Sequence, residues 1–85
     1  MDIRLYQRNY REDLAQAMEQ EKAGRFIDAA LSYKKAQHHA ASANLLENAR
    51  FAMARRVRCL KMAGDREWTQ VNDKYQKLYL SPEIN

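Results

Sequence analysis

Apolar residues recur along the chain at the three- and four-residue spacing of amphipathic helices, and short breaks separate the runs. The pattern predicts a first helix that ends at Gly24, because glycine adopts the left-handed conformation of a helix C-terminus without steric cost. Its start is open: residues 1–8 alternate like an extended arm, whereas Asp2 and Asn9 are both suitable N-terminal caps. We favour a helix that starts at one of those two residues.

A second helix is predicted over residues 26–41, with an apolar face made largely of alanine. The residues to which we assign a structural role on this face are Phe26, Ala29, Ala30, Tyr33 and Ala36. Small side chains let two helix axes approach closely, so the first two helices should form a tight hairpin around Gly24. Ile27 and Leu31 lie to one side of the face, where we expect them to meet another helix.

A third helix should begin at Asn44, which is followed by Glu47 in the manner of a capping box, and should run to Ala63 before Gly64. Its apolar positions fall on two faces. One face contains Leu46, Ala49, Met53, Val57 and Leu60, and the other contains Phe51, Ala52, Cys59 and Met62. A helix with two apolar faces is either packed between two neighbours or offers one face to a partner.

A fourth helix is predicted from Arg66 to Tyr79, with Asp65 as its cap. Its apolar stripe consists of Trp68, Val71, Tyr75 and Leu78. Such a stripe is typical of a core, but aromatic residues are also enriched in binding surfaces, so we keep it as a candidate docking surface and a possible dimer contact. Ser81-Pro82 should end this helix and leave residues 81–85 frayed.

Together these patterns predict one all-α domain over residues 1–85, with three to four helices and a tetratricopeptide-like hairpin. The composition agrees, since 85 residues include only two glycines and one proline, and good helix formers dominate. Cys59 is the only cysteine, which fits a reducing compartment and predicts a cytoplasmic protein. We expect no secretory leader and no membrane span. The formal net charge of +4 is a weak preference for acidic partners.

The sequence offers little for catalysis. His38 and His39 are adjacent, so their side chains diverge on a helix and we expect no metal site. Cys59 lies among apolar residues and fits a packing role better than a nucleophile. Glu19 and Glu21 fit a solvated helix surface. We therefore expect neither an enzyme nor a bound cofactor.

Four arginines on the third helix, Arg50, Arg55, Arg56 and Arg58, could instead contact DNA phosphates or base edges. They point in different directions around the helix, so we favour protein contact or structural pairing over direct DNA binding.

One ordered set of residues resembles the AraC negative regulator (ANR) family of small bacterial and phage-borne proteins. It consists of Glu19, Gly24-Arg25-Phe26, Ala29-Ala30, Tyr33 and Ala36, followed by Asn48, Phe51, Arg55 and Cys59. The match covers residues 17–59, and the family commonly has tryptophan where this chain has Tyr33 and Phe51. The PerC-like activators share a similar layout.

The resemblance implies a regulator without enzymatic activity that binds AraC/XylS-type transcription activators and blocks their dimerisation or DNA binding. Some members are reported to act on nucleoid-associated proteins. The candidate partner-binding residues are Asn48, Phe51, Arg55, Arg58, Trp68, Val71, Tyr75 and Leu78, although a structural role is the favoured reading for Phe51 and Cys59. A homodimer is expected. The alternatives are a direct DNA-binding activator of the PerC kind and a general helical adaptor.

Overall fold

The computed structural model describes residues 2–80, which form four α-helices and, within that range, no strand. The helices are α1 (Ile3–Lys22), α2 (Phe26–Ser42), α3 (Leu46–Met62) and α4 (Trp68–Tyr75), and a π-helical turn, η1 (Gln76–Leu80), continues α4. The predicted all-α fold is confirmed. The predicted fraying of residues 81–85 lies outside the described part of the chain.

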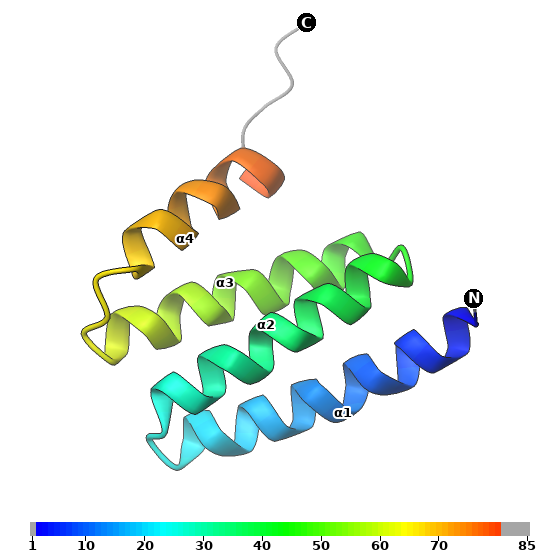
Figure 1. Cartoon of the computed structure of the whole chain (residues 1–85), viewed down its shortest axis with the longest axis horizontal. Helices are drawn as coiled ribbons and strands as arrows, with labels where there is room; N and C mark the ends of the chain where they lie inside the picture. The colour runs from blue at the N-terminus through cyan, green and yellow to red at the C-terminus, as the bar shows by residue number, and fades with distance from the viewer. Residues whose placement is uncertain (1, 81–85) are drawn as a thin grey trace, which may run out of the picture.

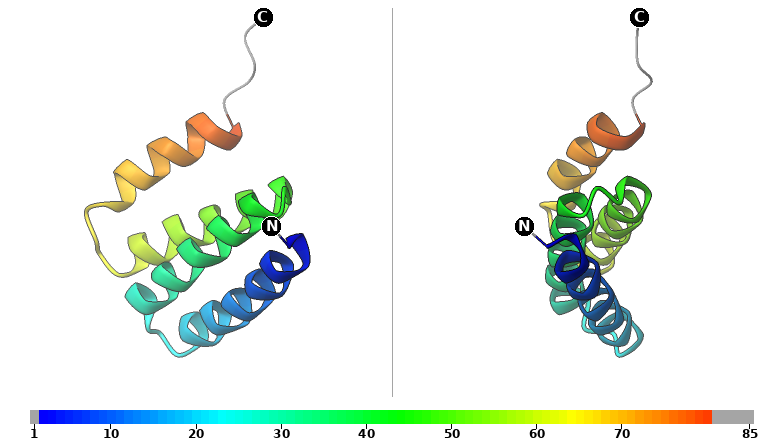
Figure 2. Two further views of the ribbon diagram at one scale, coloured as in Figure 1. Left: turned by 45° about the vertical axis from the view of Figure 1, so that its right-hand side comes forward. Right: turned by 90° about the vertical axis from the view of Figure 1, so that its right-hand side faces the viewer.

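Successive helices lie side by side and run in alternating directions (Figure 1). The order α1, α2, α3, α4 can also be followed in the left view of Figure 2, and the Cα atoms span only 15 Å in the thinnest direction against 36 and 35 Å in the others. In such a flat row the inner helices have neighbours on both sides. The packing of α3 between α2 and α4 explains why residues of both its apolar faces, such as Met53 and Cys59, are buried, although Phe51 and Met62 stay exposed. The tetratricopeptide-like detail stays a prediction.

The first helix starts at Ile3, and Asp2 is its cap. The Asp2 side chain accepts a hydrogen bond from the Arg4 backbone N–H at 2.9 Å, which satisfies one of the free donors of the first turn. Residues 3–8 are helical, so the extended arm was the wrong alternative, as was the start at Asn9. The physical reason is the burial of Tyr10, which lies two helical turns before the buried Ala17 and on the same side of α1. The helix that carries both residues therefore extends past Asn9 towards the N-terminus.

All three interhelical turns use one backbone design. Gly24, Asn44 and Gly64 each have a positive φ, of 76°, 61° and 73°, and they stand at equal intervals of twenty residues. After each of them the next backbone N–H reaches back to a carbonyl five residues earlier, at 2.8–3.0 Å, which is the Schellman pattern. The predicted stop at Gly24 is confirmed. Asn44 is not the predicted N-cap, because the turn uses it in the left-handed conformation that asparagine tolerates better than most residues.

Small side chains fill the contact between the first three helices. Ala17, Ala29, Ala36 and Ala49 are fully buried, and so is Tyr33, the largest side chain among them. Because alanine faces let helix axes approach closely, the hairpin prediction agrees with this packing. Ala30 is buried too, and Phe26 packs partly buried against the core.

Three aliphatic residues do not pack as predicted. Ile27 and Leu31 were expected to meet another helix, but they are 47% and 56% exposed on the outer side of α2. Leu46, assigned to the same apolar face of α3 as Ala49 and Met53, is 60% exposed because it occupies the first helical position after the turn.

The last helix begins two residues later than predicted. The Asp65 side chain does accept a backbone hydrogen bond, from Glu67 at 2.8 Å, but residues 66 and 67 form a turn and α4 starts at Trp68. Its far end widens into η1 and extends to Leu80, one residue beyond the predicted end. Val71 anchors α4 to the core with 6% exposure.

Candidate partner-binding surface

One row of side chains follows the outward side of α3 at alternating spacings of three and four residues. We call it the α3 stripe; its members are Asn48, Phe51, Arg55, Arg58 and Met62. Because a helix turns about 100° per residue, this spacing keeps all five within one narrow sector. Phe51 is 43% exposed and Met62 is 60% exposed, while the Arg55 guanidinium lies 5.6 Å from the centre of the Phe51 ring. The stripe therefore presents apolar and cationic groups together.

The structure separates the two residues for which a structural role was favoured. Cys59 is completely buried, in agreement with a packing role. Phe51 is 43% exposed, so the idea that it builds the core is wrong: it lies four residues, about one helical turn, before the groove-lining Arg55. Of the resemblance residues on this helix, Asn48, Phe51 and Arg55 are therefore reachable by a partner.

A carboxylate from α1 meets the two central arginines of the stripe. The Glu21 side chain is 17% exposed, and its Oε1 accepts a hydrogen bond from the Tyr33 hydroxyl at 2.7 Å. Its Oε2 lies 3.9 Å from Arg55 Nη1 and 4.0 Å from Arg58 Nε. These separations permit charge attraction but exceed hydrogen-bond length. Glu21 thus balances the arginines without satisfying their donors.

The sequence interpretation missed Glu21 by treating it, with Glu19, as a solvated surface carboxylate. Glu19 is indeed exposed, but Glu21 follows Tyr10, Leu14 and Ala17 at helical spacing and so lies on the inward row of α1. That register was the available signal. The neighbouring Gln20 also turns inward and accepts a hydrogen bond from the buried Ser32 hydroxyl at 2.6 Å.

A groove of about 530 Å³ lies between the C-terminal halves of α1 and α3. Met18, Phe26 and Met62 are the large apolar residues of its lining, and Lys22, Arg55 and Arg58 supply positive charge beside Glu19 and Glu21. This volume lies within the range of ligand sites in proteins. The groove joins the C-terminal half of the α3 stripe to the exposed side of α1. The α3 stripe and the groove together form our candidate partner-binding surface.

The acidic hydroxyl and thiol near Glu21 stay protonated at neutral pH. Burial raises the pKa of Tyr33 well above its usual range, and the hydrogen bond to Glu21 raises it further. Burial raises the pKa of the Cys59 thiol to about 11, and the negative charge of Glu21 adds to this shift. Because the thiolate is the reactive form of cysteine, Cys59 is poorly suited to nucleophilic chemistry.

We expect the free energy of unfolding to fall as the pH rises from about 8.5 towards about 11. The unfolded chain releases the Cys59 proton above a pKa of about 8.5, whereas the folded chain holds it up to about 11. Stability linked to this group is thus intact below the unfolded pKa and is lost as the pH approaches the folded one. Tyr33 acts in the same direction at still higher pH.

Urea denaturation of the wild type and of Cys59→Ala, at several pH values across this window, measures the effect. The variant should lose less stability than the wild type over the interval. Parallel declines in the two proteins would contradict the role assigned to Cys59.

Most residues of the predicted docking stripe on α4 pack against the core. Val71 is buried, and Trp68 and Tyr75 are partly buried against the core, with the Lys61 ammonium 4.9 Å from the Trp68 ring centre. Leu78 alone is widely open, at 65% exposure. A continuous exposed stripe on α4 is therefore not formed, because the short helix needs these side chains to hold it against α3.

The remaining arginines of α3 point elsewhere, as the sequence indicated. Arg50 forms an ion pair with Glu47 at 2.9 Å, near a second hollow that Phe51 and Tyr75 also line. Arg56 is partly buried, and this burial lowers its pKa. Only Arg55 and Arg58 come together, so α3 does not carry one continuous arginine face.

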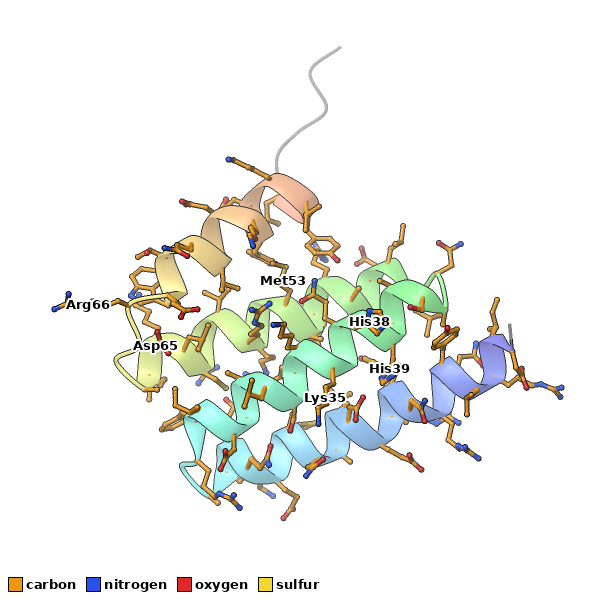
Figure 3. All side chains as sticks on the ribbon, viewed as in Figure 1. Lys35, His38, His39, Met53, Asp65 and Arg66 are labelled. Carbon is orange, nitrogen blue, oxygen red and sulfur yellow. The ribbon has the colours of Figure 1, made fainter. Side chains whose placement is uncertain are left out.

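The two histidines have separate environments. His39 lies between α1 and α2, with its Nδ1 2.6 Å from an Asp13 carboxylate oxygen, whereas His38 is exposed (Figure 3). Over residues 2–80, no group of three His, Cys, Asp or Glu side chains is placed to hold a metal ion. The Asp13–His39 contact joins the middle of α1 to the C-terminal half of α2, and neither residue lines the groove.

Comparison with known proteins gives no match: no protein-family model, curated protein or solved structure matches the chain. The likeness to AraC negative regulators therefore stays a prediction based on the residues that carry it. Among the described helices, none combines the length and apolar character needed to cross a membrane.

Proposed function

We propose that this chain is a small helical regulator that binds an AraC/XylS-type transcription activator through the α3 stripe and thereby blocks its dimerisation or its approach to DNA. The single observation that supports this most is that Asn48 and Phe51 are exposed, and Arg55 is partly exposed, on one side of α3. These are residues of the resemblance, and a partner can reach all three on one surface.

The chemistry of the stripe suits protein contact. Phe51 and Met62 supply exposed apolar area, and arginine is among the residues most often found at binding hot spots. Apolar contact would give most of the affinity, and the positive net charge would speed encounter with an acidic region of the activator. A lone, buried, protonated cysteine fits a binding role in the cytoplasm better than a catalytic one.

Direct DNA binding is the weaker alternative. Phosphate contact along a duplex needs several basic side chains on one surface. On α3 only Arg55 and Arg58 converge, and both face Glu21. This arrangement supports a protein partner over a nucleic acid.

Co-expression with a set of tagged AraC-type activators tests the proposal. We expect at least one activator to retain the chain during affinity purification and to lose promoter activation in a reporter strain. A purified chain that binds no activator but shifts operator DNA, with affinity falling steeply as salt rises, would overturn the proposal in favour of the PerC-like alternative.

A further inference from the structure

The guanidinium groups of Arg55 and Arg58 are incompletely satisfied. Their closest approaches to Glu21 are 3.9 and 4.0 Å, beyond hydrogen-bond length. The Nε atom of Arg55 is buried and has no hydrogen-bond partner among residues 2–80. Buried polar groups in proteins nearly always have a partner. Arg55 Nε itself is out of a ligand's reach, but both arginines line the groove with side chains 31% and 63% exposed, so their other N–H groups are available to a ligand.

The side chains that line the groove carry a net positive charge, which one incoming carboxylate would neutralise. Lys22, Arg55 and Arg58 carry three positive charges, and Glu19 and Glu21 carry two negative ones, so the lining has a net charge of +1. Glu21 Oε1 is already engaged by the Tyr33 hydroxyl. An incoming carboxylate would complete the charge balance and accept the hydrogen bonds that Glu21 cannot reach, since a guanidinium matches a carboxylate in a two-point geometry.

Apolar side chains flank this charged centre. Met18 on α1 is 44% exposed and Met62 on α3 is 60% exposed. Phe26, at the start of α2, is partly buried and also lines the groove. Methionine adapts its shape to irregular apolar groups. A ligand that fits this groove therefore carries a carboxylate with apolar groups on either side of it.

The length of the surface favours a helix over a small molecule. The α3 stripe extends from Asn48 to Met62, about 21 Å at about 1.5 Å per residue. This is close to the length of about four helical turns, and recognition of an amphipathic helix in a groove uses side chains at three- and four-residue spacing. A small carboxylate would cover the groove and leave Phe51 bare.

We infer that the occupant of the α1–α3 groove is an acidic amphipathic helix of the partner, with an Asp or Glu held between Arg55 and Arg58 and apolar neighbours against Met18 and Met62. This inference rests on the proposed function for the identity of the partner but not for the chemistry of the segment. Charge complementarity with the groove is its basis.

Selection from a displayed library of amphipathic helical peptides, with the face residues randomised and the purified chain as bait, tests the inference. We expect enriched peptides to combine an Asp or Glu with leucine, phenylalanine or methionine one turn away. Fluorescence anisotropy of one enriched peptide should then show at least a tenfold loss of affinity for Arg55→Gln/Arg58→Gln. The matched control Arg50→Gln/Arg66→Gln removes the same number of charges outside the groove and should change the affinity less than twofold.

A second variant tests the groove without disturbing the contacts of Glu21 with Arg55 and Arg58, whose loss could affect folding. Met62→Asp alters an exposed position and leaves both arginines in place, so the chain should stay helical and still lose at least tenfold in affinity. The inference is overturned if no peptide is enriched, if enriched peptides are basic, or if both arginine pairs behave alike. It is also overturned if decanoate occupies the groove and no helical peptide competes with it.

The two proposals fail in distinguishable ways. If an activator co-purifies equally well with Arg55→Gln/Arg58→Gln and with the wild type, but is lost with Phe51→Asp, the groove inference fails and the proposed function stands. If acidic helical peptides bind through the groove but no AraC-type activator does, the proposed function fails and the groove inference stands.

Discussion

Replacing Tyr33 with alanine is expected to lower the free energy of unfolding by about 3–5 kcal/mol, as for other large-to-small changes of a buried aromatic residue. Tyr33 is fully buried at the contact of the first three helices, where the surrounding alanine side chains are too short to fill the space it leaves. The change also removes the hydroxyl that donates to Glu21. A loss of this size approaches the whole stability of a small domain.

Urea denaturation followed by far-ultraviolet circular dichroism measures this loss. Tyr33→Phe is the matched control for the ring: it keeps the packing and removes the hydrogen bond, and should cost about 1–2 kcal/mol. Leu78→Ala, at a position 65% exposed, should stay within about 0.5 kcal/mol of the wild type. A Tyr33→Ala protein as stable as Leu78→Ala would show that the described core is wrong.

Replacing Phe51 with aspartate should weaken activator binding by about 2 kcal/mol or more, roughly thirtyfold in the dissociation constant. The change removes the aromatic ring from the α3 stripe and places a carboxylate beside Arg55, whose guanidinium now lies over that ring. Because Phe51 is exposed, the fold should survive. Biolayer interferometry with an immobilised activator measures the affinity.

Ile27→Asp is the matched control for this change. Ile27 is 47% exposed against 43% for Phe51, but it belongs to α2 and lines neither the groove nor the hollow beside Phe51. Both variants should melt near the wild-type temperature, and only Phe51→Asp should lose binding. Equal losses in the two variants, or none in either, would move the partner-binding surface away from α3.

The helices follow directly from the spacing of apolar residues, and their ends follow only where one residue type dominates the choice. Gly24 and Gly64 marked two turns because glycine alone takes a positive φ freely. Asn44 is favourable both as an N-cap and in the left-handed conformation, so local chemistry did not decide between them. The position of Asn44, twenty residues from Gly24 and twenty from Gly64, favours the left-handed conformation. That regularity appears only once the three turns are compared.

The candidate site was only partly predictable for a related reason. The spacing of Asn48, Phe51 and Arg55 placed them together, but which side of α3 faces a neighbour depends on where α4 packs. The position of α4 could not be predicted from the sequence, so Val71 was assigned to a docking stripe, whereas the structure buries it in the core. Glu21 was missed because a carboxylate on an inward row is rare without partners, and its partners Tyr33, Arg55 and Arg58 come from two other helices.

The most direct test of the partner-binding surface uses the methionine methyl groups of the chain. Met18 and Met62 line the groove, whereas Met53 is 2% exposed and lies between α3 and α4 (Figure 3). Carbon-13 methyl labelling of the four methionines reports on these three, together with Met1, in one NMR spectrum. On addition of the activator, the Met18 and Met62 signals should shift or broaden while the Met53 signal stays in place. Unchanged Met18 and Met62 signals in a saturated complex would contradict binding at the groove.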